Sequence, residues 1–458
     1  MPDTSLDLAQ PSAAIQAVLT AVAADPVASQ GLAAIQDRNP EFAGPLAARL
    51  TGAVLTPDGR RLADRILNTY WADDSRRQAL VRSMGTDREV IIGSGFHAAV
   101  YAATRVLSGY PKPLVLERAE RPGGTFALTD WPVFHLNSPN RRGGAGPAGD
   151  QASSPNYLPG APIQAASLSM EDYQANTDMA LIIRLTLAQY AEVITGAQIV
   201  AVSTDGIGVQ AETAADGPLS AGRIIDARGL GDPIDRDLAN DTTILTSPQF
   251  LRRMTGSWPL RGARSVAVLG GGDSGKCAVE SLLGIGPHPR LAAAALDTVD
   301  RIDWYSTDLP TTCQQWRRDI RCRYQPIGRH LRPDRYGRRR LTVLSRQARP
   351  IGLPGSALID GRTYDLAVLC TGNKETTLGG LAPELFDPFV THGVPVAQQH
   401  YELPVYRVGP HARLPFTAEE RDDGLADMPS NAVSMWRTGP LTAALAASLP
   451  PVTAGPVT

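Results

Sequence analysis

The sequence has almost no excess of either charge, and its apolar runs are short. Its 458 residues carry 44 Lys and Arg against 46 Asp and Glu, a formal net charge of -2. A nucleic-acid-binding domain normally shows a basic excess, so this balance argues against one. No apolar run approaches the ~20 residues that a membrane-spanning helix needs, and the N-terminal "MPDTSLDLAQPSAA" lacks the basic and apolar regions of a secretory signal. We therefore expect a cytoplasmic enzyme with no membrane and no nucleic-acid partner.

Cysteine is also scarce. The chain has 4 cysteines, and no two of them form a C-x-x-C pair: Cys277, Cys313, Cys322 and Cys370. This spacing argues against a disulfide framework and against a flavin-linked dithiol centre. The 7 histidines show no metal-ligand spacing, and no nucleophile motif is present. We predict no metal site.

The chain is long enough for two or three domains. Residues 1–87 show helical patterning without a cluster of catalytic residue types. They predict a helical extension that packs against the core or against a partner subunit, which leaves a homo-oligomer open. Beyond them, short apolar runs that end in glycine alternate with helical patterns. This order is typical of an α/β fold, and we predict two Rossmann-like βαβ units.

Local patterns predict further elements. The run "YQANTDMALIIRLTLAQYAEV" predicts a helix with Asn176 or Thr177 as its N-cap. The run "AQIVAVSTDGIGVQAE" predicts a hairpin that turns at Asp205 and Gly206. Residues 125–170 are rich in Pro, Gly, Asn and Ser, which is typical of a functional or a disordered loop.

The first glycine turn lies in "EVIIGSGFHAAVYAATRVLSGYPKPLVLE", where Gly93, Gly95 and Ala98 have the G-x-G-x-x-G/A spacing. The first glycine permits a tight turn, the second lets the backbone approach a pyrophosphate, and the third small residue lets helix and strand pack closely. Glu117 ends the next strand, at about the 20-residue spacing where an acid accepts hydrogen bonds from ribose hydroxyls. This βαβ unit predicts a dinucleotide site.

The second glycine turn follows "SVAVL", where Gly270, Gly272 and Gly275 have the same spacing. Its next strand ends at Ser306 without a carboxylate. An NAD site usually has an acid there, whereas a 2′-phosphate prefers hydroxyl and guanidinium groups. The sequence therefore favours NADPH over NADH, although the arginines that follow also fit a solvated basic surface. These arginines are Arg317, Arg318, Arg321 and Arg323.

The doubled layout, over roughly residues 88–445, resembles the two-dinucleotide-binding-domain flavoproteins, and among them the class B flavin monooxygenases and N-hydroxylating monooxygenases. "VLERAERPGGTF" is similar to the family's "E…GGTW/F", and "IIDARGLG" and "LAVLCTG" are similar to its two "ATG"-like domain crossings. The resemblance implies that the first turn binds FAD and the second binds NADPH. It also implies an FAD domain in two parts, 88–256 and 372–458, interrupted by an NADPH domain at 257–371.

The resemblance also implies cofactor contacts. Those at the first turn are Gly93, Gly95, Phe96, His97, Ala98, Glu117, Arg118, Gly124 and Thr125, and the others are Gly270, Gly272, Asp273, Ser274, Gly275, Ser306 and Gly372.

The loop "FHLNSPNRRG" lies downstream of the first turn, as flavin contacts do in the family. The resemblance therefore suggests Asn137, Asn140 and Arg141 as catalytic residues at the flavin's reacting face, with His135 and Ser138 beside them. Arg141 could bind a substrate carboxylate through two parallel hydrogen bonds. The alternative is a surface loop held by Asx turns.

The family's chemistry implies that NADPH passes a hydride to the flavin and that the reduced flavin activates O2 as a C4a-(hydro)peroxide. The stretch "SPQFLRRMTGSWPLRGA" lacks the F-x-G-x-x-x-H-x-x-x-(Y/W) motif of flavin and Baeyer–Villiger monooxygenases. We therefore expect oxygenation of a small nucleophile, by N-hydroxylation or N-oxidation of an amine or amino acid. A flavin reductase or dehydrogenase without oxygen insertion, and a redox-sensing or scaffold subunit, remain as alternatives.

Overall fold

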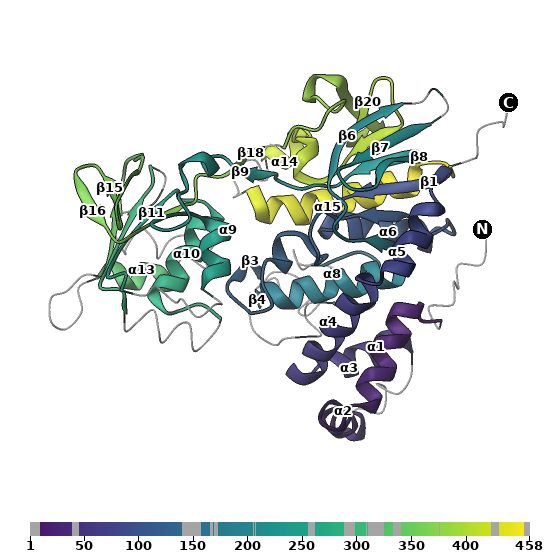
Figure 1. The fold of residues 1–458 in the computed structure, drawn as a ribbon, viewed down its shortest axis with the longest axis horizontal. Helices are drawn as coiled ribbons and strands as arrows, with labels where there is room; N and C mark the ends of the chain where they lie inside the picture. The colour runs from purple at the N-terminus through teal and green to yellow at the C-terminus, as the bar shows by residue number, and fades with distance from the viewer. Residues whose placement is uncertain are drawn as a thin grey trace.

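A computed structural model describes most of the chain. The described residues are 10–38, 45–139, 157–164, 168, 173–204, 206, 208–254, 262–287, 298–307, 309, 325–332, 340–374, 376–422 and 430–452. They form two sheet-based domains and a group of N-terminal helices (Figure 1). Among the described residues, no helix combines the length and the apolar character needed to cross a membrane.

The first domain is built on a parallel sheet with the order β21-β8-β1-β2-β5. Its strands are β1 (Gly85–Ile92), β2 (Leu114–Leu116), β5 (Glu192–Ile194), β8 (Gly217–Asp226) and β21 (Val405–Arg407). The predicted hairpin is confirmed, because β6 (Ile199–Thr204) pairs antiparallel with β7 (Val209–Thr213). Strand β7 also pairs with β8, which joins the hairpin to the sheet. A second hairpin, β19 (Phe386–Thr391) and β20 (Val394–His400), extends the sheet beyond β21.

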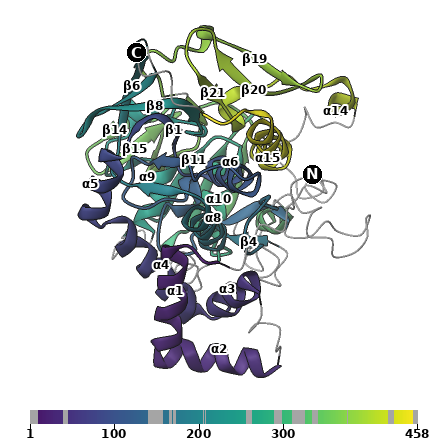
Figure 2. The ribbon, with the colours of Figure 1, turned by 90° about the vertical axis from the view of Figure 1, so that its right-hand side faces the viewer.

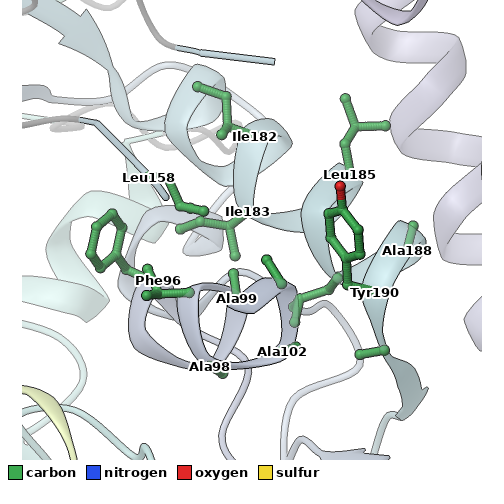
Figure 3. Close-up of a cluster of buried hydrophobic side chains, with 14 of the residues drawn as sticks. Phe96, Ala98, Ala99, Ala102, Leu158, Ile182, Ile183, Leu185, Ala188 and Tyr190 are labelled. Carbon is green, nitrogen blue, oxygen red and sulfur yellow. The ribbon is translucent and has the colours of Figure 1, made fainter. Parts of the chain in front are cut away.

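Side chains of β1 alternate between two cores, as expected for a strand that is buried on both faces. Ile91 belongs to the core under the helices, whereas Val90 and Ile92 belong to the core under β6 and β7. The helical face carries α6 (Phe96–Leu107), α8 (Asn176–Tyr190) and α15 (Ser430–Ser448). The alanines of α6 let α8 pack closely against it (Figure 3). This close packing holds the start of α6 at the carboxyl edge of the sheet.

The second domain repeats this design on a parallel sheet with the order β10-β17-β11-β12-β13. Its strands are β10 (Ile244–Thr246), β11 (Ser265–Leu269), β12 (Arg301–Tyr305), β13 (Leu341–Leu344) and β17 (Leu366–Leu369). Helices α9 (Ser247–Arg253) and α10 (Asp273–Leu283) cover one face. A three-stranded antiparallel sheet covers the other: β14 (Ile351–Leu353), β15 (Ser356–Ile359) and β16 (Arg362–Tyr364).

Two chain crossings join the domains (Figure 1). The outgoing crossing contains β9 (Asp232–Pro233), the returning one contains β18 (Asn373–Lys374), and the two strands pair antiparallel. The second sheet already includes β10, which precedes residue 257, and the division of the chain at residues 88, 257 and 372 stays a prediction.

The helical extension lies beside α8, at the side away from the second domain (Figures 1 and 2). Its helices are α1 (Ala13–Ala24), α2 (Pro26–Arg38), α3 (Leu46–Val54), α4 (Pro57–Trp71) and α5 (Asp74–Arg82). Ser12 caps α1 and also donates its hydroxyl to the Ala188 carbonyl of α8 at 2.7 Å. The sequence left open whether the extension packs against the core or against a partner subunit, and this contact is with the core.

Helix α8 begins where the sequence predicts, but the predicted cap was wrong. The N-cap is Ala175, without a side-chain hydrogen bond, and Asn176 is the first helical residue. The Asn176 amide instead serves the loop before β3: its Oδ1 accepts from Val133 N at 2.9 Å, and its Nδ2 donates to Phe126 O at 3.0 Å. The Val133 N–H needs this partner because Val133 is buried and belongs to no sheet.

The remaining short elements connect these parts. They are η2 (Gly124–Ala127), β3 (His135–Pro139), β4 (Tyr173–Ala175), η4 (Arg236–Leu238), α13 (Gln325–Gly328), η5 (Arg329–Leu331), η6 (Pro383–Leu385), η7 (Gly409–Ala412) and α14 (Ala418–Asp422).

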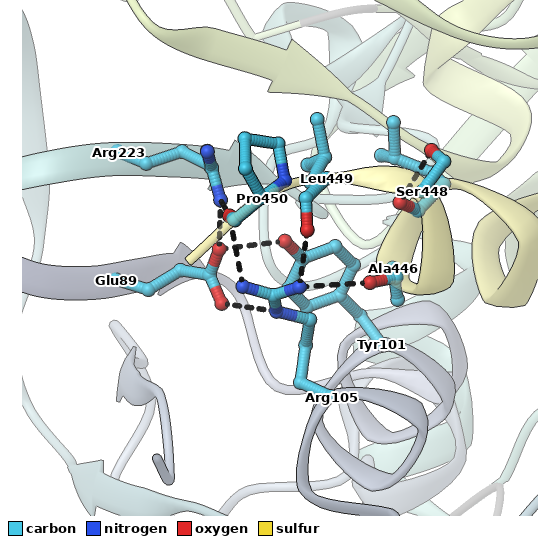
Figure 4. Close-up of polar contacts among 9 residues, drawn as sticks. Glu89, Tyr101, Arg105, Arg223, Ala446, Ser448, Leu449 and Pro450 are labelled. Atoms are coloured by element: carbon cyan, nitrogen blue, oxygen red, sulfur yellow. Dashed lines mark hydrogen bonds and ion pairs between the residues drawn. The ribbon is translucent and has the colours of Figure 1, made fainter. Parts of the chain in front are cut away.

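A buried ion network fastens the end of α15 to the sheet (Figure 4). Glu89 of β1 accepts from Arg105 at 2.9 Å, from Arg223 at 2.8 Å and from the Tyr101 hydroxyl at 2.8 Å. Arg105 also donates to the carbonyls of Ala446 and Leu449. The end of the C-terminal helix is thereby held against the last turn of α6.

Candidate functional site

In the first glycine turn, the fold requires glycine at position 93 but not at position 95. Gly93 has a φ of +92°, and a Cβ there would lie 2.9 Å from Ala227 O, so both the backbone conformation and its neighbour require glycine. Gly95 has an ordinary φ of -81°, and the nearest atom to its added Cβ is Gly124 Cα at 3.9 Å. The fold itself therefore does not need glycine at 95. The open space there fits a ligand that approaches the backbone closely.

The start of α6 faces this space. Its N-cap, Gly95, makes no side-chain hydrogen bond, so no capping side chain competes with an anion for the helix N-terminus. The side chains of Phe96 and His97 point inward: both are buried, and His97 Nε2 lies 2.7 Å from Thr438 Oγ1 of α15. Their backbone N–H groups lie at the N-terminus of α6, and the cofactor contacts of both residues stay a prediction. Ala98 is fully buried in the packing against the sheet.

Glu117 lies at the carboxyl end of β2 and is oriented by the turn. Its Oε2 accepts from Ser94 N at 3.0 Å and from Ser94 Oγ at 2.6 Å, and its Oε1 accepts from Ala119 N at 2.8 Å. The carboxylate is therefore fixed beside the turn before any ligand binds. Arg118 instead lies on the surface, 60% exposed, with Nη2 3.3 Å from Asp232 Oδ1.

The turn before η2 closes the other side of the space. Gly123 N donates to Ser94 Oγ at 3.1 Å, and Gly124, with a φ of +60°, would place a Cβ 2.9 Å from Gly95 Cα. Thr125 follows in η2. The two glycine-containing turns thus lie against each other, with glycine on both sides of the contact.

A buried carboxylate lies where β8 and β21 end. The Asp226 carboxylate is fully buried and accepts from Arg228 Nε and Nη2 at 2.8 Å, while His411 Nε2 lies 3.2 Å from its Oδ2. Burial alone would raise the pKa of Asp226, but the hydrogen bonds from Arg228 and His411 and their charges outweigh it and lower that pKa well below its usual range. Arg407 Nε is 3.5 Å from the same carboxylate.

The second glycine turn repeats the first. Gly270 has a φ of +114°, and its Cβ would lie 2.0 Å from Cys370 O. Gly275 packs against the turn, since its Cβ would lie 2.1 Å from Gly270 O. Gly272 has an ordinary φ of -73°, and nothing lies within 4 Å of its Cβ position. The middle glycine again borders open space at a helix N-terminus, here that of α10, which begins with Asp273 and Ser274.

Ser306 and Arg346 lie at the carboxyl edge of the second sheet. Ser306 follows β12, and a Cβ on Gly271 would lie 2.2 Å from its Oγ, so the serine borders the glycine turn. Both Ser306 N and Arg346 N donate to Leu344 O, at 3.0 and 2.8 Å. Arg346 was not among the residues that the sequence predicted at this edge. The signal was present as "LTVLSR", a basic residue shortly after an apolar strand.

Other predicted residues lie elsewhere or outside the described part of the chain. Gly372 lies at the domain crossing, where its carbonyl accepts from Ile234 N at 3.1 Å. His135 and Asn137 belong to β3, which pairs with β4. Outside the described residues are Asn140, Arg141, Arg317, Arg318, Arg321 and Arg323.

Within the described ranges, no three His, Cys, Asp or Glu side chains are grouped as metal ligands would be. Cys277 and Cys370 are both buried, and burial raises the pKa of the Cys370 thiol well above its usual value.

The fold is similar to that of several solved enzymes. L-lysine 6-monooxygenase from Pseudomonas syringae aligns over 79% of this chain and 100% of its own, with 14% identity and a TM-score of 0.50. Ornithine N-hydroxylase from Kutzneria sp. 744, in a structure with reduced FAD, NADP+ and L-ornithine, aligns over 79% and 99%, with 14% identity and a TM-score of 0.50. Thioredoxin reductase from T. acidophilum aligns over 79% and 97%, with 14% identity and a TM-score of 0.45.

No protein-family model matches the chain, and no curated protein matches its sequence. At these identities the likeness to the solved enzymes is one of fold. It confirms the predicted fold class, two Rossmann-like domains with the first interrupted by the second, and the expected resemblance in fold to the N-hydroxylating monooxygenases.

The Asp226 cluster generates a prediction about acid stability. Replacing Asp226 by Asn leaves the guanidinium groups of Arg228 and Arg407 buried without their counter-charge. We expect a loss of roughly 3–5 kcal/mol in the free energy of unfolding near neutral pH. Because the folded-state pKa of Asp226 is lowered, its stabilisation is full above the ordinary carboxyl pKa of about 4 and is lost as the pH falls below that value.

Urea unfolding of the wild type and of Asp226→Asn across acidic and neutral pH measures this difference. The difference in the free energy of unfolding between the two proteins should be largest above about pH 4 and should become smaller below it. The control is Asp300→Asn, which removes a surface pair with Arg264 and should cost less than about 1 kcal/mol. A difference in the free energy of unfolding that stays constant or grows toward acidic pH would contradict the lowered pKa of Asp226.

Proposed function

We propose that the protein is an FAD- and NADPH-dependent monooxygenase that oxygenates a small nucleophilic substrate, by N-hydroxylation of an amine or amino acid. The observation that carries the proposal is the repeated open space at Gly95 and Gly272. In both turns the fold would accept a Cβ at the middle glycine, yet the sequence leaves the space free in front of a helix N-terminus. Two such spaces on two sheets fit two dinucleotides.

The first turn has the groups that FAD requires. The N-terminus of α6 would bind the pyrophosphate, and Gly95 would let the backbone approach it. Glu117 would accept from the ribose hydroxyls, because its carboxylate already faces the turn. Its existing bonds to Ser94 and Ala119 keep it in place for this role.

The second turn has the groups that NADPH requires. The N-terminus of α10 and Gly272 would bind the pyrophosphate. Ser306 would supply a hydroxyl and Arg346 a guanidinium, and these groups suit a 2′-phosphate better than a carboxylate would. The Arg346 guanidinium is half exposed, and its Nε pairs with Asp360 Oδ2 at 2.8 Å. When both cofactors are bound, they supply a hydride and a reduced flavin that can react with O2.

The substrate side of the proposal rests on the stretch at residues 134–143, which includes β3. Asn137, Asn140 and Arg141 would offer hydrogen-bond donors at the reacting face, and Arg141 would bind a carboxylate if the substrate is an amino acid. The fold shared with L-lysine 6-monooxygenase and with ornithine N-hydroxylase supports an amine-bearing substrate.

The proposed function is tested by measuring whether oxygen is inserted into an amine or is released as hydrogen peroxide. The protein is purified with FAD and mixed with NADPH and O2 in the presence of a panel of amines and amino acids, including L-lysine and L-ornithine. We expect that one substrate class raises NADPH consumption and yields hydroxylated amine in step with the NADPH consumed. A reductase would instead convert all consumed NADPH into hydrogen peroxide or reduced acceptor, whatever amine is added, and that outcome would exclude the monooxygenase.

The two middle glycines generate a paired prediction. Because alanine fits both positions in the fold, Gly95→Ala and Gly272→Ala should fold with thermal stability equal to or slightly above that of the wild type. Gly95→Ala places a methyl group in the pyrophosphate space and should weaken FAD binding by about 1–3 kcal/mol, or roughly 5- to 150-fold in Kd. Gly272→Ala should keep FAD but weaken NADPH saturation by a similar factor.

Flavin fluorescence titration measures the first effect, and the NADPH dependence of anaerobic flavin reduction measures the second. Exchanged effects, with FAD lost in Gly272→Ala and retained in Gly95→Ala, would reverse the assignment of the two sites. Wild-type behaviour in both variants would refute both sites.

Arg346 generates a prediction about coenzyme choice. Arg346→Ala should raise the half-saturating concentration of NADPH by roughly tenfold or more, since a charged hydrogen bond to phosphate is lost. NADH has no 2′-phosphate, so its half-saturating concentration should hardly change. The matched control is Arg264→Ala, which removes an exposed arginine at the opposite edge of the same sheet. Equal effects on NADPH and NADH would place the 2′-phosphate elsewhere.

A further inference from the structure

The N-terminal extension reaches the first glycine site through α4. Asp64 of α4 accepts a hydrogen bond from Arg121 Nη2 at 2.6 Å, and Arg121 directly precedes the Pro122–Gly124 turn. The Arg121 side chain is only 15% exposed, and it also pairs with Asp130. One carboxylate of the extension is therefore bound to the segment that closes the dinucleotide space.

Arg184 of α8 makes a second connection between the same parts. Its side chain is fully buried, and its Nε forms an ion pair with Asp64 Oδ1 at 3.1 Å. Its Nη1 donates to Pro122 O at 3.3 Å, and its Nη2 donates to Asn68 Oδ1 of α4 at 2.6 Å. Burial lowers the pKa of Arg184 to about 10, and the nearby Asp64 charge opposes that shift. A cation buried in this way needs its counter-charge, and the extension supplies it.

The turn that these contacts hold contains two consecutive glycines. Gly123 and Gly124 have φ values of +123° and +60°, in a region that glycine enters easily and leaves easily. Gly123 N donates to both Ser94 O and Ser94 Oγ. The position of this turn also decides how much space remains at Gly95, because Gly124 lies against it. A small displacement of the turn would fill or open the pyrophosphate space.

We propose that the helical extension is a working part of the FAD site, and that Asp64 is its positioning residue. Through Arg121 and Arg184, Asp64 holds the Pro122–Gly124 turn where it leaves room for a pyrophosphate at Gly95. This inference rests on the proposed function, because it takes the first turn to be the FAD site. It assigns a role to residues that precede the dinucleotide fold and that carry no catalytic groups of their own.

The test uses the full-length protein and the variants Asp64→Asn and Asp64→Glu. Asp64→Asn keeps the size of the side chain but removes its charge, and we expect the Kd for FAD to rise about tenfold or more. Asp64→Glu retains the charge and should recover most of the affinity. The matched control is Asp58→Asn on the same helix, since Asp58 pairs with Arg61 one turn away on the surface. Its Kd for FAD should equal that of the wild type.

Two further readouts separate positioning from general stability. The visible circular dichroism of bound flavin reports its environment, and it should change in Asp64→Asn at saturating FAD. The concentration of NADPH that half-saturates flavin reduction should remain unchanged, because the second site lies in another domain. If Asp64→Asn fails to fold, Arg121→Gln is measured in its place, with the same expected loss of FAD affinity.

The outcomes distinguish the inference from the function on which it rests. A wild type that binds no FAD would overturn the proposed function, and this inference with it. Wild-type FAD binding that Asp64→Asn and Arg121→Gln leave unchanged would overturn this inference alone. An equal loss in Asp58→Asn would also overturn it, because the effect would then belong to α4 as a whole.

Discussion

In both domains, the first glycine of the turn lies against a backbone carbonyl where a neighbouring strand ends. A Cβ at Gly93 would lie 2.9 Å from Ala227 O, just after β8, and one at Gly270 would lie 2.0 Å from Cys370 O, just after β17. These carbonyls begin the two crossings between the domains. The contacts that shape the dinucleotide turns therefore also fix where the chain leaves each sheet, and a larger residue at either glycine would disturb a turn and a crossing together.

Charged groups reinforce this arrangement on the first sheet. Asp226 ends β8 immediately before the crossing, and Arg228, which pairs with it, also donates to the Thr376 carbonyl on the returning crossing. The antiparallel pairing of β9 with β18 continues the link. On the other side of the site, Asp64 and Arg184 connect the extension to the turn at Gly123. The proposed FAD space is thus flanked by two sets of buried ion pairs, one at the outgoing crossing after β8 and one between α8 and the N-terminal extension.

The sequence was sufficient to predict the parts that follow local rules. The two turns, their strands and the hairpin at β6 and β7 come from glycine spacing and apolar runs, which act over a few residues. The sequence was insufficient to predict contacts in which a side chain hydrogen-bonds to a segment far away in the chain. Asn176 was predicted to cap its own helix, but it bonds the loop at Val133, and nothing near it in the sequence indicates that partner. The pairing of Asp64 with Arg121 has the same origin in tertiary packing, and so does the position of Arg346 beside Ser306.

The central claim is that the two turns hold two cofactors of a single reaction, with a hydride passing from the second site to the first. The most direct measurement is anaerobic single-turnover mixing of the FAD-bound protein with increasing NADPH, followed by the visible absorbance of the bound flavin. The account predicts that one FAD per chain is bleached in a phase whose rate saturates with NADPH and is slower at the same concentrations of NADH. Bound FAD that NADPH reduces no faster than it reduces free flavin would contradict it.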